Sequence, residues 1–516
     1  MPERSLRHEP DTPNKGTATF VVASSTASQA VKQAADFVCN GTADDVEIQA
    51  ALDAAALVKG AVHCTEGVYA ISATLTINDD TTLQGVPEGT VFSLDSEVDD
   101  SVIENDDPSG GDANIVLRDF KIDGNQATND AAGSHGIFMD KVTGLRIEGV
   151  NVFDCFDVGI YTDNSADVQI NQCSVGGTET TVAFHVKIQT TTDVQIANVI
   201  VQNGHYGFYI EDCDYVSLVN CDAKGTADDA LVVGVGAAAS NYVSVVGCHF
   251  QGSTGDKGAH ILECNYVTIA DTIFEGNSSF GVVVDEAAKY ISFSACHFQG
   301  NGNSGINLGS SHSSIIGGTA VGNTNHGVIV TATTAVGDVL VKDMVCTDNT
   351  VGGIVISTNA TKVMVQGNRC GNVVASAQNY GLHIDAAGVG ATSIISNNDF
   401  RDNATNTILN ASTSADIIFH NNSSDLTADL ASATTITIPP DYDFYNLTGS
   451  TAITGITASW AGRRVSLKFG GNITVTDGNN IILAGGANMV GVANDTITLV
   501  SDATNWYEES RADNTP

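Results

Sequence analysis

Apolar and polar residues alternate along short segments of this chain, and these segments recur at a nearly constant interval between residues 114 and 402. Each segment opens with a glycine and continues as an alternating apolar run, as in HGIFMD from His135 and YGLHIDA from Tyr380. The repeated glycines are Gly136, Gly159, Gly207, Gly258, Gly281, Gly305, Gly327, Gly353 and Gly381, with His185 and Asp229 expected at the same position in two further copies. Neighbouring copies are 22 to 29 residues apart.

A second alternating run follows each first one, for example DVQINQCSV from Asp167, YVSLVNCDA from Tyr215 and KVMVQGNRC from Lys362. Two or three short strands per period, separated by glycine, asparagine and aspartate turns and without a helix between them, are typical of a solenoid. One coil cannot bury its own apolar face, so stacked neighbours must form the core. The pattern predicts an all-β fold, a right-handed parallel β-helix of about eleven to twelve coils over residues 87–423.

Residues 20–86 have a different pattern, which predicts an N-terminal cap containing an amphipathic helix. The apolar residues at helical spacing are Val46, Ile48, Ala51, Leu52 and Ala55. Thr42 is the expected N-cap, and Asp44 and Asp45 suit the first turn of a helix. We expect these two aspartates to stabilise the helix end rather than to act in catalysis.

After residue 423 the repeat is lost, and residues 424–516 predict a small antiparallel β domain. Turns are expected at Asp477-Gly478 and Asp502-Ala503, with aromatic bulk from Trp506. The last coil of a solenoid exposes strand edges and core, so this domain is expected to cap the solenoid or to form a trimer. Residues 1–19 are polar and lack the apolar segment of a secretory signal. We expect these residues to form a polar arm that has no packed core of its own.

Three segments resemble the pectate-lyase-like β-helix superfamily, which includes polysaccharide lyases, epimerases and virus tailspikes. They are GTADDVEIQAALDAA, EGVYAIS and TTLQGV, within residues 41–86. The resemblance implies the fold and a helix that plugs the open end of the solenoid, but no particular activity, because one fold hosts many chemistries. The tail within residues 424–516, with GRRVSLKF, TDGNN, ILAGG, TLVSD and the closing TNWYEESR, resembles small β domains that end the tail fibres and appendages of tailed viruses. That likeness implies an appendage of a virus particle.

The net charge of −39 argues against a nucleic-acid partner, because a phosphate backbone would be repelled. The acidic, lysine-poor composition also suits a virus of a halophilic host. No apolar run approaches the roughly 20 residues that cross a bilayer, so no membrane insertion is expected. The absence of a signal peptide predicts synthesis in the host cytoplasm.

Eleven cysteines are present. Cys173, Cys221, Cys248 and Cys296 share one position of the repeat, which Asn368 or Asn398 fills further on. Stacked inside the solenoid they would behave as small apolar residues, and disulfides along this column are not expected. Pairing of Cys39 with Cys64 stays open.

Side chains alternate between the inside and outside of a strand, so each glycine-led run places two rows of residues on the surface. The first outward row is Phe138, Tyr161, Lys187, Tyr209, Leu231 and His260, and the second is Asp140, Asp163, Gln189, Glu211, Val233, Leu262 and Asp285. Neighbouring coils are about 4.8 Å apart. We therefore expect an aromatic strip flanked by carboxylates, with Lys187 at its centre.

Such a strip suits an extended glycan, whose sugar rings pack on aromatic rings and whose hydroxyls bond to acids. The glycan-binding candidates are Phe138, Asp140, Tyr161, Asp163, Lys187, Tyr209 and Glu211. Catalysis is not assigned, but its candidates are Asp163, Lys187, Tyr209 and Glu211. Carboxylate pairs could serve a hydrolase, and a lyase would use Lys187 or Tyr209 as base with Ca²⁺ neutralising a uronate. An ordinary soluble surface also carries such residues.

The sequence thus predicts a tailspike or fibre of a virus particle, a homotrimer that binds a host-surface glycan or glycoprotein. The arm would attach it to baseplate or capsid proteins, no cofactor is required, and a metal is not assigned beyond the Ca²⁺ of the lyase case. The alternative is a polysaccharide lyase or glycoside hydrolase on the same fold. A second alternative is a capsid or baseplate decoration without a ligand.

Overall fold

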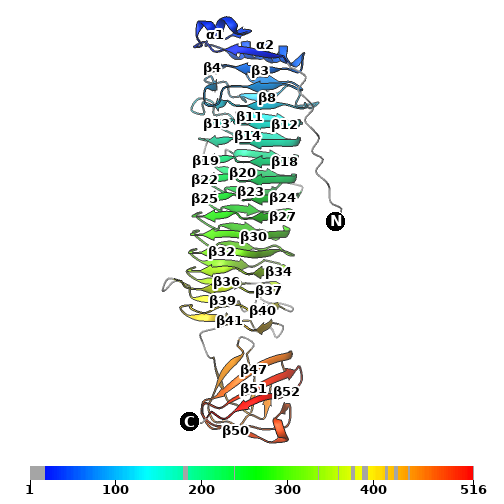
Figure 1. Ribbon diagram of the computed structural model, residues 1–516, viewed down its shortest axis with the longest axis vertical. Coiled ribbons are helices and arrows are strands. Elements are labelled where there is room, and N and C mark those ends of the chain that lie inside the picture. Colours follow the sequence, from blue (N-terminus) through cyan, green and yellow to red (C-terminus); the bar gives the residue numbers. More distant parts are fainter. Residues whose placement is uncertain are drawn as a thin grey trace. The chain divides into compact units, whose positions relative to one another are not determined.

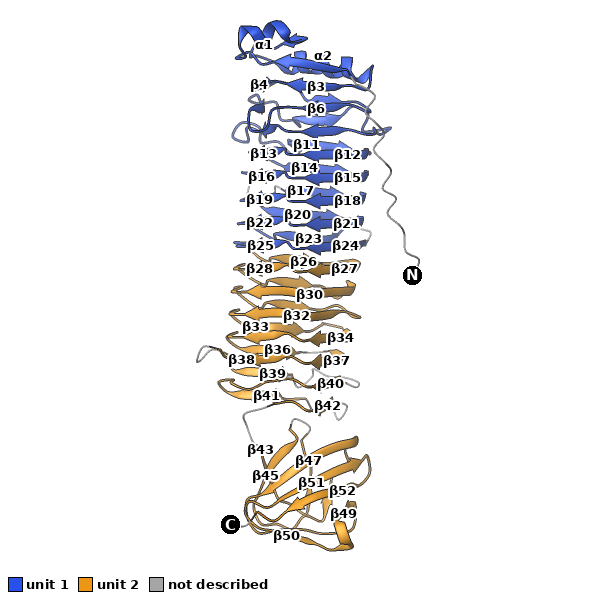
Figure 2. Ribbon diagram, in the orientation of Figure 1, with its two compact units in different colours: residues 1–255 blue, residues 256–516 orange. Residues whose placement is uncertain are grey.

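The structure, a computed structural model, describes residues 18–177, 184–236, 239–334, 336–357, 359–373, 378–385, 393–412, 417–423, 428–439 and 442–514. Most of the predicted arm, residues 1–17, lies outside the described residues. Contact density divides the chain into two compact units, Met1–Gly255 and Asp256–Pro516 (Figure 2). They are called unit 1 and unit 2 and are described separately.

Both units contain coils of parallel strands, drawn as stacked arrows in Figure 1. The strands that follow the repeat glycine form one face, here called the glycine face. In unit 1 these strands are β5 (Leu75–Ile77), β8 (Ile103–Asn105), β11 (Ile137–Asp140), β14 (Val158–Asp163), β17 (Phe184–Gln189), β20 (Tyr206–Glu211) and β23 (Leu231–Val235). In unit 2 they are β26 (Ala259–Ile261), β29 (Val282–Val284), β31 (Ile306–Leu308), β33 (His326–Val330), β36 (Gly352–Ile356), β39 (Tyr380–Ile384) and β41 (Asn406–Asn410).

The second run of each repeat forms another face, here called the tyrosine face. In unit 1 it contains β1 (Thr19–Ala23), β3 (Ala61–Cys64), β6 (Thr82–Gln84), β9 (Val116–Arg118), β12 (Thr143–Glu148), β15 (Ala166–Asn171), β18 (Thr192–Ala197), β21 (Asp214–Val219) and β24 (Ser240–Val246). In unit 2 it contains β27 (Cys264–Ala270), β30 (Lys289–Gln299), β32 (Ser314–Val321), β34 (Val336–Lys342), β37 (Ala360–Gln366), β40 (Ser393–Ser396) and β42 (Ile417–His420).

Short strands form a third face. In unit 1 they are β4 (Gly67–Ile71), β7 (Thr90–Leu94), β10 (Lys121–Asp123), β13 (Asn151–Phe153), β16 (Ser174–Gly176), β19 (Ile200–Gln202), β22 (Asp222–Lys224) and β25 (His249–Gln251), and β2 (Phe37–Val38) pairs with β1. In unit 2 they are β28 (Ile273–Glu275), β35 (Val345–Thr347) and β38 (Arg369–Gly371), and the long strands β30 and β32 continue onto this face.

The predicted right-handed parallel β-helix is confirmed, with about 17 coils rather than eleven or twelve. The sequence count was too low because coils near both ends, such as those of β5 and β41, lack the repeat glycine. Inward residues pair directly between coils, as Ile137 does with Ile160 and Val186 with Phe208, and all four are fully buried. Each pair removes apolar surface from water, which is the main stabilising contribution in a solenoid.

The repeat glycines are required by the close approach of neighbouring coils. A Cβ atom on Gly159 would lie 2.3 Å from Cγ1 of Val175 and 2.8 Å from the carbonyl oxygen of His185. At Gly136 the corresponding distance to the Gly159 oxygen is 2.6 Å. These contacts also place His185 in register with the glycines, as predicted.

The register predicted for the next strand, β23, where Asp229 was expected at the glycine position, is wrong by one residue. Tyr209 pairs with Val232, not with Leu231, and a bulge makes Glu211 pair with Val235. The residue opposite Gly207 is therefore Ala230 instead of Asp229. Leu231 and Val233, predicted on the surface, are fully buried, so both predicted outward rows are interrupted after Tyr209 and Glu211.

The inward column of small polar side chains is confirmed. Cys173, Cys221 and Cys296 each lie within 3.3–3.7 Å of a carbonyl oxygen in the preceding coil, and Asn368 donates to such an oxygen at 3.0 Å. All eleven cysteines are buried free thiols, so Cys39 and Cys64 are not paired. Buried backbone acceptors thus receive partners without covalent links.

Two helices begin unit 1, α1 (Gln29–Ala34) and α2 (Asp45–Ala56), at the dark-blue end in Figure 1. The N-cap of α2 is Asp44 and not Thr42, whose hydroxyl instead donates to Asn40. Asp44 accepts from the backbone of Gly41 and Ala70, so its carboxylate ties the helix start to β4. The apolar side of α2 is buried against β1, β3 and β5, which is the plug that the sequence predicted, although Val46 is exposed.

The last part of unit 2 is a small mixed β domain. Antiparallel pairs join β47 (Ala461–Phe469) to β51 (Thr496–Asp502), β51 to β52 (Trp506–Ala512), and β48 (Ile473–Val475) to β50 (Met489–Gly491). The parallel strands are β43 (Ala428–Ala431), β45 (Phe444–Thr448), β44 (Thr435–Ile436), β46 (Gly455–Ile456) and β49 (Ile481–Ile482), and a 3₁₀ turn, η1 (Ala484–Gly486), follows β49. The fully buried Trp506 lies in its core.

No helix of the described residues has the length and apolar character needed to cross a bilayer.

Candidate functional site

Four successive strands of the glycine face in unit 1 bring the predicted site residues together. Phe138 pairs with Tyr161, Tyr161 with Lys187, and Lys187 with Tyr209. Asp140, Asp163, Gln189 and Glu211 form the neighbouring row in the same way. We call these eight residues the aromatic strip. The alternation of strand side chains and the direct register between coils produce it, as the sequence indicated.

The rings of the strip contact one another and surround a cation. The ring centroids of Phe138 and Tyr161 are 4.9 Å apart. The ammonium nitrogen of Lys187 lies 5.0 Å from the Tyr161 centroid, 5.4 Å from that of Phe184 and 5.9 Å from that of Tyr209. Distances below about 6 Å are those of cation–π contacts, so the ammonium group is held between three rings.

Sequence reasoning missed three rings that complete this cluster. Phe184 stacks on Tyr206 with centroids 5.1 Å apart, and Phe184 meets Tyr209 edge-on at 4.6 Å. His135 packs against Tyr161 at 5.4 Å. Each of the three precedes the repeat position directly. An aromatic residue at that place in HGIFMD, FHVKIQ and YGFYIED was therefore the available signal.

Polar contacts fix the carboxylate side of the strip. Lys187 forms an ion pair with Glu211 at 3.3 Å, and both side chains are less than one-fifth exposed. The hydroxyl of Tyr161 donates to Oε1 of Gln189 at 2.6 Å, and Asn164 donates to Asp140 at 3.0 Å. A partly buried charge pair with further hydrogen bonds is stronger than an exposed one, so the strip is rigid before any ligand arrives.

Burial changes the protonation of the strip. It raises the pKa of Tyr161 far above the ordinary value, helped by the nearby charges of Asp163 and Glu211. Burial also raises the pKa of Tyr209, and the nearby charge of Glu211 raises it further. Burial also raises the pKa of Asp163, although the Asn164 backbone N–H opposes the change. The phenols therefore act as neutral hydrogen-bond donors, not as bases.

A group of possible metal ligands, Cys39, Asp44 and Glu47, lies near the start of α2. Asp44 already accepts two backbone N–H groups, and burial raises the pKa of the Cys39 thiol, with Asp44 adding to the effect. A protonated thiol is a poor metal ligand, so the donor set suits a helix end and not a metal centre. The predicted Ca²⁺ stays a prediction.

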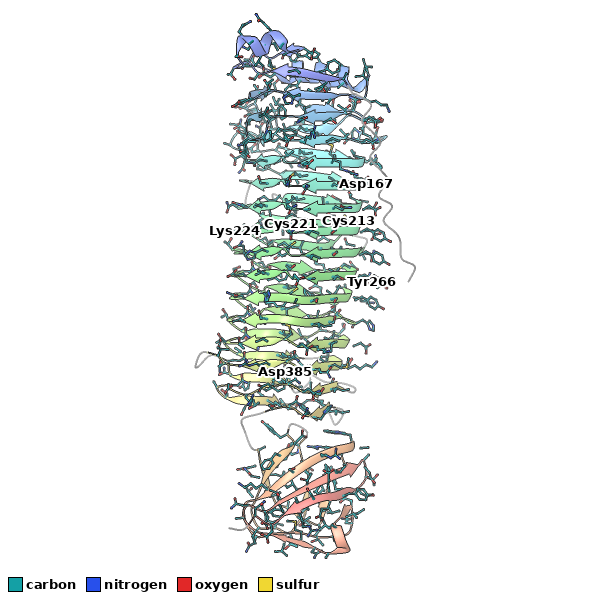
Figure 3. The ribbon with its side chains drawn as sticks, viewed as in Figure 1. Asp167, Cys213, Cys221, Lys224, Tyr266 and Asp385 are labelled. Carbon is teal, nitrogen blue, oxygen red and sulfur yellow. The ribbon has the colours of Figure 1, made fainter. Side chains whose placement is uncertain are left out.

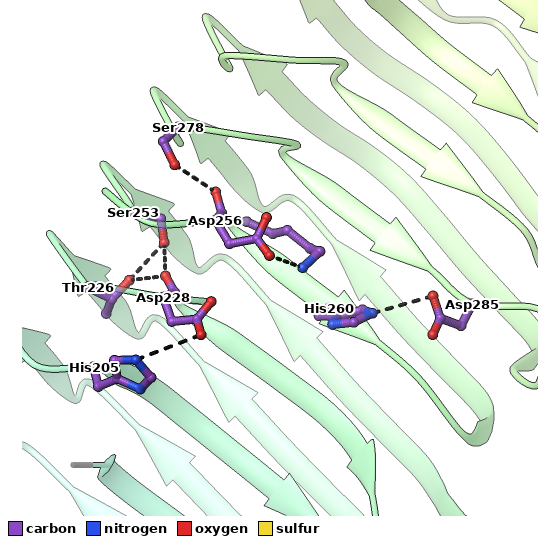
Figure 4. A network of polar contacts seen from close by, with 9 residues as sticks. His205, Thr226, Asp228, Ser253, Asp256, His260, Ser278 and Asp285 are labelled. Atoms are coloured by element: carbon purple, nitrogen blue, oxygen red, sulfur yellow. Dashed lines mark hydrogen bonds and ion pairs between the residues drawn. The ribbon is translucent and has the colours of Figure 1, made fainter. Parts of the chain in front are cut away.

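Figure 4 shows polar contacts near the glycine face in both units. In unit 1 the hydroxyls of Thr226 and Ser253 are 2.8 Å apart, and Ser253 also bonds to the backbone oxygen of Asp228, whose carboxylate lies 3.8 Å from His205. In unit 2, Nε2 of His260 lies 3.4 Å from Asp285. The contacts of Thr226 and Ser253 join successive turns, which favours a structural role.

A second aromatic column lies on the tyrosine face. Tyr215 and Tyr242 in unit 1 stack at 4.9 Å with an interplanar angle of 5°, and Tyr266 stacks on Tyr290 in unit 2 at 4.9 Å and 6°. All four side chains are exposed, and Figure 3 labels Tyr266. Their backbones have positive φ, which costs roughly 1–2 kcal/mol for such a residue. Sequence reasoning did not identify this column, although its four tyrosines are the first residues of YVSLVNCDA, YVSVVGCHF, YVTIADTIF and YISFSACHF.

A family model described as "Right handed beta helix region" matches residues 66–233, 184–335 and 233–424. A comparison with curated proteins found no match. Solved structures with a similar fold include the A-module of the Azotobacter vinelandii mannuronan C-5 epimerase AlgE6, at 17% identity and a TM-score of 0.48, covering 74% of this chain and 95% of that one.

Two further structures are similar in fold. The periplasmic alginate epimerase AlgG has 12% identity and a TM-score of 0.42, with 70% of this chain and 79% of that chain covered. Tailspike protein 3 of bacteriophage CBA120 has 15% identity and a TM-score of 0.43, with 76% and 61% covered. At these identities the likeness concerns the fold alone, because one fold hosts many functions.

Proposed function

This chain belongs to the family of proteins with a right-handed β-helix region, and we propose that it binds an extended host-surface glycan along the aromatic strip of unit 1. The observation that carries the proposal is the set of rings fixed around the Lys187 ammonium, within 5.0–5.9 Å of it. A surface that is already ordered loses little conformational entropy when a ligand binds.

The chemistry of the strip matches that of a sugar chain. Phe138 and Tyr161 offer apolar ring surface to the C–H groups of sugar rings. Asp140 and Asp163 offer acceptors to sugar hydroxyls, and the ammonium of Lys187 offers a donor. Because successive coils are about 4.8 Å apart, residues on neighbouring strands can contact successive parts of one extended chain.

The same contacts favour binding over chain cleavage. A lyase needs a base at this place, but burial keeps Tyr161 and Tyr209 protonated, and Lys187 is engaged by Glu211 at 3.3 Å. The polysaccharide lyase or hydrolase is therefore the competing outcome of the test below.

The place of the protein in a virus particle is a further part of the proposal. It is supported by the resemblance of residues 424–516 to virus appendage domains and by the polar character of residues 1–19. We propose a homotrimeric tailspike or fibre that is attached through this arm. Light scattering of the full chain tests the trimer, and a monomeric mass would contradict it.

The binding proposal is tested on a glycan array with the full chain and with Tyr161→Asn and Tyr209→Asn variants. Each variant should lose binding by roughly tenfold, the equivalent of one aromatic contact. The matched control is Tyr242→Asn, which removes the same kind of ring from the tyrosine face and should bind as the unchanged chain does.

Products of bound glycans are then analysed by mass spectrometry. Intact glycans after long incubation support binding alone. Release of oligosaccharides that stops in the Tyr209→Asn variant would replace the proposal with the enzyme. Equal binding by all variants without release of products would contradict both.

A further inference from the structure

Unit 2 has a groove of about 680 Å³ on its glycine face, away from the aromatic strip in sequence. Val283 of β29 and Asn307 of β31 lie in its floor. Its sides contain Asp285 and Glu286 after β29, and Thr331 to Thr333 after β33. The volume is within the range of small-ligand sites, which is about 300–1,000 Å³.

The sides of the groove are held by side-chain hydrogen bonds between coils. The Glu286 carboxylate accepts from the backbone N–H of Thr333 and from the hydroxyl of Thr334, the latter at 2.7 Å. The amide of Asn359 donates to the carbonyl oxygens of Ala332 and Thr333 at 3.2 and 2.8 Å. The turn after β33 is thus tied on both sides, and the groove is preformed.

One polar atom in the floor is buried without a partner. Oδ1 of Asn307 makes no hydrogen bond and has almost no exposed surface. A buried polar atom without a hydrogen bond is unfavourable, so this side chain favours a ligand that supplies one. The Asn307 side chain also lines the groove, and its amide can take either of two orientations. A ligand hydroxyl both donates and accepts, so it can pair with whichever amide atom faces the groove.

The charge of the groove narrows the ligand class. Two carboxylates, those of Asp285 and Glu286, border it, and none of the described residues that line it is lysine or arginine. A uronate or another anion would be repelled. Aliphatic groups of Val283, Ala287 and Ala332 offer contact to C–H surface, whereas the strip of unit 1 offers rings and an ammonium group.

We infer that this groove is a separate binding site for a neutral sugar unit, whose hydroxyls pair with Asn307 and Asp285 and whose C–H face rests on Val283. The site is independent of the aromatic strip, since it uses other residues in the other unit. It would hold a neutral hexose or N-acetylhexosamine and reject a uronate.

The test is saturation-transfer NMR on the full chain with glucose, galactose, mannose and N-acetylglucosamine as probes, and with galacturonate as the anionic probe. At least one neutral probe should bind. Asn307→Leu and Val283→Trp should each weaken that binding at least tenfold, the first by removing the amide and the second by filling the groove. Tyr161→Asn should leave it unchanged.

Folding of the variants is measured in the same samples. Asn307→Leu replaces a side chain whose amide oxygen is buried without a hydrogen bond by an apolar group of similar size, so the variant should unfold at the same temperature as the unchanged chain or higher. Binding of no neutral probe would overturn the inference. So would unchanged binding in both groove variants, or galacturonate binding that depends on Asn307. Loss of binding in Tyr161→Asn alone would assign the sugar to the strip and overturn the second site.

Discussion

The glycine face has the same backbone in both units but very different surfaces. In unit 1 its first outward row is Phe138, Tyr161, Lys187 and Tyr209, and in unit 2 the row is His260, Val283, Asn307, Ile329, Val355 and His383. The inward residues are apolar in both units, for example Ile160 and Ile354, each fully buried. The fold constrains only the inner positions, so the outer rows are free to specify different ligands.

The two surfaces also differ in how their polar groups are paired before a ligand binds. The strip of unit 1 pairs its cation internally, since Lys187 meets Glu211 at 3.3 Å. The groove of unit 2 leaves the amide oxygen of Asn307 buried without a partner. If the two binding proposals hold, a ligand of unit 1 would gain contacts with rings, whereas a ligand of unit 2 would supply a hydrogen bond to Asn307.

The largest expected effect concerns the histidine that precedes the repeat glycine, which is His135 in unit 1 and His326 in unit 2. Burial lowers the pKa of both, and it lowers that of His326 to about 4, where His383 adds to the effect and Asp385 opposes it. Because the unfolded chain binds this proton near pH 6.5, the stability contributed by neutral His326 is present above that pH. It is lost as the pH falls from 6.5 to 4, by about 3 kcal/mol.

Urea unfolding between pH 4 and 7 measures this loss. His326→Gln should make the pH dependence of the free energy of unfolding distinctly shallower. His312→Gln, which changes an exposed histidine in the same unit, should leave it as it is. Equal slopes for His326→Gln and the unchanged chain would show that His326 is not held neutral by the fold.

A second prediction separates the strip from the rest of unit 1. Lys187→Met leaves the mostly buried Glu211 carboxylate without its cation, and it should weaken the local structure by about 2 kcal/mol. The change is read from hydrogen exchange of the β17 and β20 amides, because coils of a solenoid open locally.

Glu211→Gln in the Lys187→Met background removes the unpaired charge and should restore part of that protection. A double variant as unprotected as the single one would mean that Lys187 acts through its ring contacts and not through Glu211.

The repeat itself made much of this molecule predictable. Direct register between coils follows from the glycines, and it placed Phe138, Tyr161, Lys187 and Tyr209 in one row. The prediction was wrong at Leu231 because Ala230, and not Asp229, lies opposite Gly207, and neither residue is a glycine that would mark the position.

The groove of unit 2 could not be predicted from periodicity. Its sides depend on Glu286 and Thr333, which lie 47 residues apart in turns that differ from coil to coil. The tyrosine column is a different case, because a tyrosine stands at the same position in four successive repeats. A residue with positive φ near the start of a strand is, however, expected to be glycine, asparagine or aspartate, so the tyrosines were not recognised as a column.

The smallest expected effect concerns that column. The rings of Tyr215 and Tyr242 cover each other's faces at 4.9 Å, so they stabilise the stacking of coils by about 1 kcal/mol, which offsets the cost of a φ near +57° at Tyr242. Tyr242→Asn loses the stacking but adopts this φ readily, so the free energy of unfolding should change by less than about 1 kcal/mol. Thermal unfolding measures it. A loss of several kcal/mol would mean that the exposed column, and not only the buried core, holds the coils together.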